Sequence, residues 1–235
     1  MSNKKICLIQ PGRLGDIIFS LPIAKYYNDL GYLIDWYIHE DYYDISSDID
    51  YVNFIKIPNQ ISIFSTVMYV YYQIRNDFYE KIIDLSIGFP STKAVMDFNY
   101  KTFVHNKYAI AQVDISKRWQ LEFKRNYEKE ISLSKKLNPS GEEYIIIHNN
   151  SSSGIFDIPI ESNINKIYFD KYDGFNIFNW SSLIEGSTEI HCVDSSFVNF
   201  VDTFENLHSK LFYYNTSKTP SDFLKTPLKN KWIII

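Results

Sequence analysis

Cysteine is scarce in this sequence, whose 235 residues include only Cys7 and Cys192. Each lies in an apolar run that predicts a buried strand, and the two runs belong to opposite halves of the chain. We expect two structural free thiols and a reducing, cytoplasmic compartment, because disulfides are rare in such compartments. The two cysteines and five histidines lack the spacing of metal ligands, so no metal site is predicted.

Long apolar runs and an excess of positive charge are also missing. No stretch of 18 apolar residues exists, and the four apolar residues 6–9 are too few for a signal-peptide core. We therefore expect at most peripheral contact with a membrane. The net charge of −4 argues against a nucleic-acid partner, because proteins that bind nucleic acid usually carry a basic face.

Three common nucleotide and hydrolase signatures are absent. Gly12 and Gly15 have the spacing G-x-x-G, which differs from the dinucleotide fingerprint G-x-G-x-x-G, and the Walker phosphate loop is missing. Ser195 and Ser196 do not lie in a G-x-S-x-G elbow, which counts against an α/β-hydrolase.

Apolar strands alternate with segments of helical periodicity, which predicts an α/β fold with parallel sheets. The expected strands cover residues 5–10, 33–38, 51–57, 81–85, 144–148, 165–169, 189–193 and 210–214. The expected helices are one that starts at Asp16, 61–75, a charged helix over 117–136, 180–185 and 195–204. A turn cluster at 138–141 predicts a boundary between domains 1–138 and 139–235.

The first candidate site is the turn between the first strand and the first helix. Ligands of open α/β sheets bind at the carboxyl ends of strands, where Gly12, Arg13, Gly15 and Asp16 fall. The glycines allow close backbone approach to a phosphate or acceptor, and Arg13 adds a cation. An Asp16 carboxylate near the positive end of a helix is expected to keep a low pKa and to act as a general base. The alternative interpretation is an ordinary helix N-cap at Asp16.

A second candidate follows the strand at 189–193. Asp194, Ser195 and Ser196 come directly before or at a helix start, which suits a diphosphate. One of the two serines could equally be a simple N-cap.

The third candidate is the polar loop after the strand at 144–148. His148, Asn149 and Ser151 are expected at the same edge of their sheet and could contact the phosphates or sugar of a ligand. A histidine satisfied by the backbone at a strand end is the alternative.

Residues 12–22, Gly-Arg-Leu-Gly-Asp-Ile-Ile-Phe-Ser-Leu-Pro, resemble the N-terminal motif of the ADP-heptose:lipopolysaccharide heptosyltransferase family, and residues 193–196 resemble its second motif. The resemblance implies a GT-B fold of two Rossmann-like lobes facing across a cleft. It implies an N-terminal lobe for a glycan or glycolipid acceptor and a C-terminal lobe for a nucleotide-sugar co-substrate, with no further cofactor. The implied reaction is metal-independent and inverting, with Asp16 as catalytic base and Asp194 as donor-binding residue.

The sequence departs from that family in its second lobe. The lobe is reduced in length, Ser196 stands where the family usually has glycine, and no lysine matches the donor-binding lysine of the family. Two hypotheses therefore stay open: an active glycosyltransferase for a bacterial surface glycan, or a non-catalytic protein that binds a nucleotide or a partner. A Rossmann-type nucleotide enzyme of another class is a third, less favoured reading.

Overall fold

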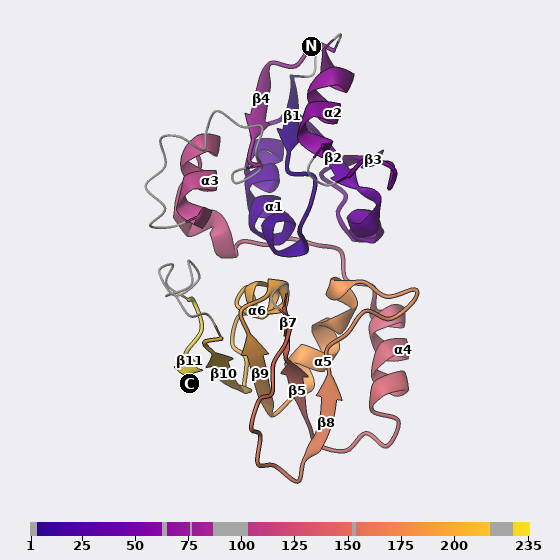
Figure 1. The fold of residues 1–235 in the computed structure, drawn as a ribbon, viewed down its shortest axis with the longest axis vertical. Coiled ribbons are helices and arrows are strands. Elements are labelled where there is room, and N and C mark those ends of the chain that lie inside the picture. Colours follow the sequence, from indigo (N-terminus) through magenta and orange to yellow (C-terminus); the bar gives the residue numbers. More distant parts are fainter. Residues whose placement is uncertain (1–3, 63–64, 76, 87–102, 152–153, 217–227) are drawn as a thin grey trace. The chain divides into compact units, whose positions relative to one another are not determined.

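The protein is described from a computed structural model that covers residues 4–62, 65–75, 77–86, 103–151, 154–216 and 228–235. The chain divides into two compact units, Met1–Lys124 and Arg125–Ile235. Each unit is an α/β structure built on a parallel sheet, as the alternation of strands and helices predicts (Figure 1). The division falls before the last helix that precedes the predicted turn at 138–141, so that helix lies with the second unit.

Unit 1 contains a four-stranded sheet in the order β3-β2-β1-β4. Every neighbouring pair is parallel, which places the carboxyl ends of all four strands at one edge. The strands are β1 (Lys5–Ile9), β2 (Leu33–His39), β3 (Asn53–Ile57) and β4 (Lys81–Asp84). The helices are α1 (Leu14–Asp29), α2 (Thr66–Ile74) and α3 (Phe103–Ala111), with 3₁₀ turns η1 (Glu40–Asp48) and η3 (Ile115–Trp119).

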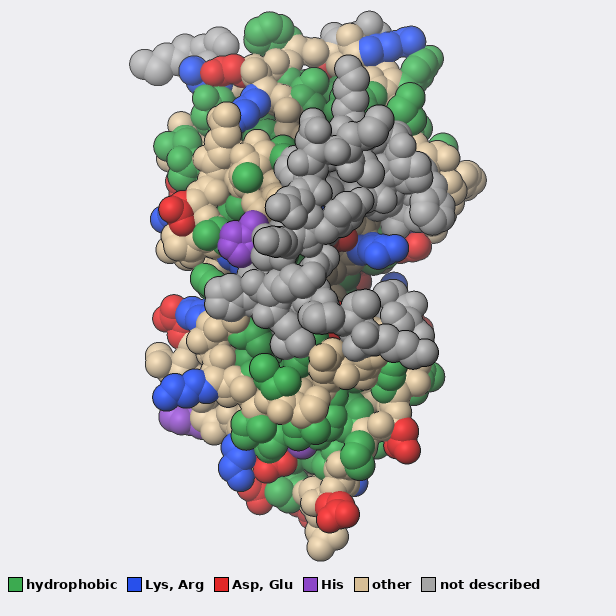
Figure 2. Space-filling view, turned by 60° about the vertical axis from the view of Figure 1, so that its left-hand side comes forward, with side chains coloured by type: hydrophobic (Ala, Val, Ile, Leu, Met, Phe, Trp, Pro, Cys, Tyr) green, Lys and Arg blue, Asp and Glu red, His purple; other side chains and the backbone are tan. Residues whose placement is uncertain are grey.

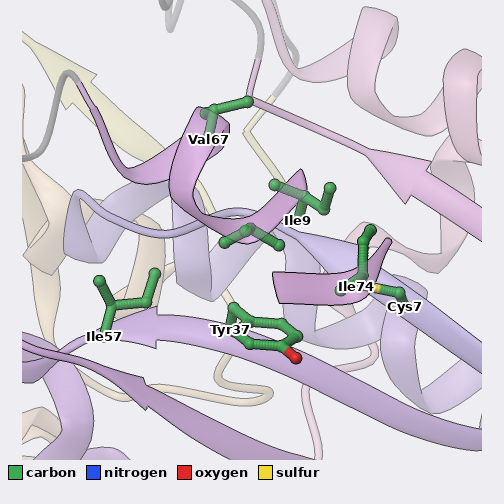
Figure 3. Packing of buried hydrophobic residues seen from close by; sticks show 7 residues of the cluster. Cys7, Ile9, Tyr37, Ile57, Val67 and Ile74 are labelled. Atoms are coloured by element: carbon green, nitrogen blue, oxygen red, sulfur yellow. The ribbon is translucent and has the colours of Figure 1, made fainter. Parts of the chain in front are cut away.

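Helix α2 covers one face of this sheet through its apolar stripe. Val67, Val70 and Ile74 recur at helical spacing and are buried against side chains of β1, β2 and β3 (Figure 3). Cys7 is part of this cluster, which explains its burial as a structural thiol.

Unit 2 contains a five-stranded sheet in the order β11-β10-β9-β5-β8, again parallel throughout. Its strands are β5 (Tyr144–His148), β8 (Asn165–Tyr168), β9 (Glu189–Val193), β10 (Lys210–Tyr214) and β11 (Trp232–Ile234). Its helices are α4 (Tyr127–Leu137), α5 (Ser181–Gly186) and α6 (Ser196–Val201), with the 3₁₀ turn η4 (Ile177–Trp180). A short antiparallel hairpin joins β6 (Asn150–Ser151) to β7 (Gly154–Ile155).

Two sequence expectations about helices are wrong. The first helix starts at Leu14, so Asp16 lies in its first turn and is not its N-cap. The charged helix expected over 117–136 is interrupted at 120–126. The backbone N–H of Lys124 donates to the carbonyl of Asp48 at 2.7 Å, which removes it from a helical ladder. Asn126 then starts α4 as a true N-cap, accepting from the N–H of Lys129 at 3.1 Å.

Strand β11, which the sequence does not predict, is bonded to the end of α6 through Asp202. The Asp202 carboxylate accepts from the backbone N–H groups of Lys229 and Asn230 and from the indole Nε1 of Trp232, each at 3.0 Å. We expect Asp202→Ala to destabilise unit 2 by about 1–3 kcal/mol, because donors in a part-buried site lose their acceptor. Hydrogen exchange at 229–235 is expected to accelerate, and an exposed control, Asp173→Ala, is expected to leave it unchanged. Equal exchange in both variants would contradict this role of Asp202.

Candidate functional site

The β1–α1 turn places Asp16 at the carboxyl edge of the unit 1 sheet. Gln10 follows β1 directly and is buried, with its carbonyl accepting from the indole Nε1 of Trp36 at 2.8 Å. Its side-chain Nε2 donates to the carbonyl of Gly12 at 2.7 Å, which shapes the turn from within. Asp16 is the third residue of α1, and its side chain is 13% exposed.

A lysine on α3 faces Asp16. The Nζ atom of Lys107 lies 3.6 Å from Oδ1 of Asp16, and the Lys107 side chain is fully buried. The same Nζ donates to the carbonyl of Leu85 at 2.6 Å and to the side-chain Oε1 of Gln10. The end of β1, the end of β4 and the first turn of α1 therefore all contact the Nζ atom of Lys107.

The expected low pKa of Asp16 is wrong. Burial raises the pKa of this carboxyl above its ordinary value, and the nearby charges of Lys107 and Arg13 only partly oppose that effect. Burial likewise lowers the pKa of Lys107, against the pull of Asp16. The helix start alone does not set the charge state of Asp16. A carboxylate with a raised pKa is a stronger base whenever it is ionised.

Arg13 takes the strained position of the turn. Its φ is 56°, in the left-handed region that non-glycine residues rarely occupy, and it is exposed. The glycines on either side, Gly12 and Gly15, have no positive φ, so neither is required by a left-handed turn. Residues held in such sparsely populated backbone conformations cluster at functional sites.

In unit 2, two of the predicted segments meet at one sheet edge. Strands β5 and β9 are neighbours in parallel register, with His148 opposite Cys192. His148 therefore lies at the same edge as residues 194–196, which follow β9. The ring of His148 packs against Phe197 of α6, with ring centroids 5.6 Å apart, and against Phe169 at 4.9 Å.

Three polar atoms around this edge are buried without a hydrogen-bond partner among the described residues. They are Nδ1 of His148, Oγ of Ser195 and Oδ1 of Asn199. Ser195 occupies the N-cap position of α6, but its hydroxyl makes no capping bond. Buried polar atoms are nearly always paired in folded proteins, so a group of them next to a strand end suggests a ligand or water that pairs them.

His148 is uncharged near neutral pH. Burial lowers the pKa of its ring to about 4, although a backbone hydrogen bond at Phe169 acts in the opposite direction. A neutral imidazole carries a single N–H, so the ring cannot meet a phosphate as a cation. This restricts the role expected for His148 from the sequence.

The other predicted residues of unit 2 have varied surroundings. The side chain of Asn149 bonds within its own loop, because its Nδ2 donates to the carbonyl of Phe156 at 3.1 Å. Ser151 lies half-buried in the β6–β7 hairpin. Asp194 and Ser196 are half-buried beside Ser195 at the end of β9.

Sequence reasoning missed Lys107 and Asn199. A signal for Lys107 exists, because Val104, Lys107, Tyr108 and Ala111 follow the i, i+3, i+4, i+7 spacing of one helical face. A lysine in an otherwise apolar stripe indicates a buried partner of opposite charge. Asn199 carries no comparable signal, because its Nδ2 bonds locally to the carbonyl of Ser195 at 3.2 Å.

Metal ligands, long apolar helices and surface charge are the remaining features of the described residues. Among them, no three His, Cys, Asp or Glu side chains gather as ligands for a metal ion. None of the helices in the described ranges has the length and apolar character needed to cross a bilayer. On the face seen in Figure 2, blue and red side chains of the described residues are intermixed, without a continuous basic patch.

No family model matches the sequence, and no curated protein matches it either. Solved structures do. A glycosyl transferase family 9 structure from Veillonella parvula covers 99% of this chain and 85% of its own, with a TM-score of 0.67 and 12% identity. The E. coli heptosyltransferase WaaC with ADP-2-deoxy-2-fluoro heptose covers 98% and 92%, with a TM-score of 0.52 and 11% identity. The chain has the fold of glycosyltransferase family 9.

A third solved glycosyltransferase is also similar to this chain. The iron-containing dodecameric glycosyltransferase TibC of enterotoxigenic E. coli covers 90% of this chain and 58% of its own, with a TM-score of 0.53 and 10% identity. The α/β fold of two Rossmann-like units, predicted from the motifs at 12–22 and 193–196, is thereby confirmed. At these identities the likeness concerns the fold, and the chemistry has to be argued from the residues.

Proposed function

We propose that the protein is a glycosyltransferase that moves a sugar from a nucleotide-sugar donor to a hydroxyl of a glycan or glycolipid acceptor. The observation that carries this proposal is Asp16, a buried carboxylate paired with Lys107 at the carboxyl edge of a family 9 fold. Two solved WaaC structures hold ADP or an ADP-heptose analogue, which supports a nucleotide sugar as donor.

The proposed reaction is a direct displacement. The acceptor oxygen forms a bond to the anomeric carbon as the bond from that carbon to the phosphate oxygen breaks, which inverts the configuration. Asp16 takes the proton of the acceptor hydroxyl, because a neutral hydroxyl is a poor nucleophile. The electron pair leaves with the nucleoside diphosphate, whose charge has to be stabilised by fixed hydrogen-bond donors. No metal takes part in these steps as proposed.

Unit 2 is proposed to supply those donors. The hydroxyl of Ser195 and the Nδ1 atom of His148 are buried and lack hydrogen-bond partners among the described residues. Asp194 and Ser196 flank Ser195 and are proposed to contact the nucleotide or its sugar. The buried free thiols Cys7 and Cys192 support a reducing, cytoplasmic setting for this activity.

Ser195→Ala gives a sharp test of the donor site. We expect the affinity for ADP or the preferred nucleoside diphosphate to fall about 10- to 100-fold, as for a lost hydrogen bond to a charged group. The unliganded variant is expected to be as stable as the wild type or more stable, because an unpaired buried hydroxyl is removed. Calorimetry and thermal melting measure the two effects.

The control is Ser132→Ala on the exposed face of α4, which should change neither quantity. A loss of stability with unchanged affinity would assign Ser195 a structural role and contradict the donor site. Activity itself is measured as release of nucleoside diphosphate from a panel of nucleotide sugars. Binding without turnover over the whole panel would favour the non-catalytic alternative.

A further inference from the structure

Lys107 occupies a position whose chemistry the proposed reaction does not yet use. It projects from α3 into the carboxyl edge of the unit 1 sheet and is fully buried. Burying a lysine costs free energy unless its charge is paired and its N–H groups are bonded. The surroundings of its Nζ atom therefore indicate which charge state the fold requires.

Three groups of the described residues lie around Nζ, and each is an acceptor. They are the carbonyl of Leu85, the side-chain Oε1 of Gln10 and the carboxylate of Asp16. The orientation of the Gln10 amide follows from its other end, because Nε2 donates to the carbonyl of Gly12 and leaves Oε1 to face Lys107. An ammonium group has three N–H donors, whereas a neutral amine would turn a lone pair toward one of these acceptors. The arrangement favours the charged form.

We propose that Lys107 is a positioning residue that holds the Asp16 carboxylate ionised and fixed in the first turn of α1. This inference rests on the proposed function, in which Asp16 is the general base. Lys107 itself does not reach the reacting atoms. It acts through Asp16 and through Gln10, which ties the base to the β1–α1 turn.

The other charged and titratable groups around the pair do not replace Lys107. Arg13 also stabilises the charge of Asp16, but its side chain is exposed, so water screens it. Burial raises the pKa of the Tyr42 hydroxyl in η1, and the negative charge of Asp16 acts in the same direction, so Tyr42 stays neutral. Asp84 at the end of β4 acts on Lys107 and supports its positive charge. Of the two cations that act on Asp16 within the described ranges, Lys107 is thus the buried one.

The test replaces the charge and follows the base directly. In Lys107→Met we expect the acid limb of the kcat/KM profile to move up by about one to three pH units, the usual effect of losing an opposite charge at this distance. At pH values below the shifted limb, kcat/KM of the variant should be about 10- to 1,000-fold lower than that of the wild type. At higher pH it should recover. A lysine with a merely structural role would lower activity at every pH without moving the limb.

A second variant and a second readout keep the test independent of folding and of activity. Lys107→Gln retains a donor for the Leu85 carbonyl without a charge and should shift the limb in the same direction. Carbon NMR of the Asp16 carboxyl in the unliganded protein should show the same rise in pKa in both variants. The control is Lys25→Met, which removes the ion pairs with the exposed Asp29 and Glu122 and should leave the Asp16 titration unchanged.

Two results separate the failure of this inference from that of the function. If Asp16 titrates alike in the wild type and in both Lys107 variants, the positioning role is overturned even if the enzyme is active. If the NMR shift occurs and no nucleotide sugar is turned over, the electrostatic coupling stands and the proposed transferase reaction is wrong.

Discussion

Asp16→Asn is expected to lower kcat by about 10²- to 10⁴-fold, the usual contribution of a general base. The affinity for the nucleotide should not change, because the contacts proposed for the donor lie in unit 2. In the wild type, activity should fall as the pH drops through the pKa of Asp16. Since burial raises that pKa above the ordinary aspartate value, the loss should begin at a higher pH than for an exposed aspartate.

Asparagine keeps the size of Asp16 but leaves the buried Lys107 without its counter-charge, so folding has to be checked by thermal melting. Asp16→Glu retains the charge and moves the carboxylate by one methylene group, and it should also lose most of its turnover. Asp114→Asn, which removes one charge from an exposed cap in the same unit, is the matched control and should be fully active. Turnover of Asp16→Asn at the wild-type rate would exclude Asp16 as the base.

Much of the fold could be predicted because its strands are short apolar runs with polar ends. The strands expected at 144–148, 189–193 and 210–214 have the predicted bounds, and the one expected at 5–10 ends one residue earlier, at Ile9. Burial on both faces of a parallel sheet makes such runs continuous and easy to recognise. Strand β11 was not predicted, because its position depends on Asp202, whose bonds to 229–232 join segments distant in sequence.

The candidate site was predictable only in part, for the same physical reason. Asp16 and Ser195 follow strands, and the rule that ligands bind at carboxyl ends of strands finds them from local sequence. Lys107 lies between the expected strand at 81–85 and the expected helix at 117–136, where the sequence predicts no element. Its partners Gln10 and Leu85 are far from it along the chain. The pKa of Asp16 was predicted in the wrong direction because burial is a property of the folded chain.

Glu130→Gln is expected to destabilise unit 2 by about 3 kcal/mol, the low end of the range for breaking a buried ion pair. The low end applies because the side chain of Arg125 is 23% exposed and can turn to water. The Glu130 side chain is fully buried. It accepts from Nε and Nη2 of Arg125 and from the backbone N–H and hydroxyl of Ser182. These bonds join the start of α4 to α5, so their loss should loosen both helices.

The stability difference between wild type and Glu130→Gln should also depend on pH. Burial by itself would raise the pKa of Glu130, but the bonds from Arg125 and Ser182 outweigh it and lower that pKa. A carboxyl whose pKa is lower in the folded state stabilises the protein above its unfolded-state pKa, and this contribution disappears as the pH falls through the folded-state value. Urea denaturation at neutral and acid pH should therefore show a large stability difference between wild type and Glu130→Gln that shrinks in acid.

The control is Glu128→Gln, which replaces an exposed acid in the same first turn of α4 and should lose almost no stability. Equal losses in the two variants would mean that the ion pair is not what holds α4 to α5.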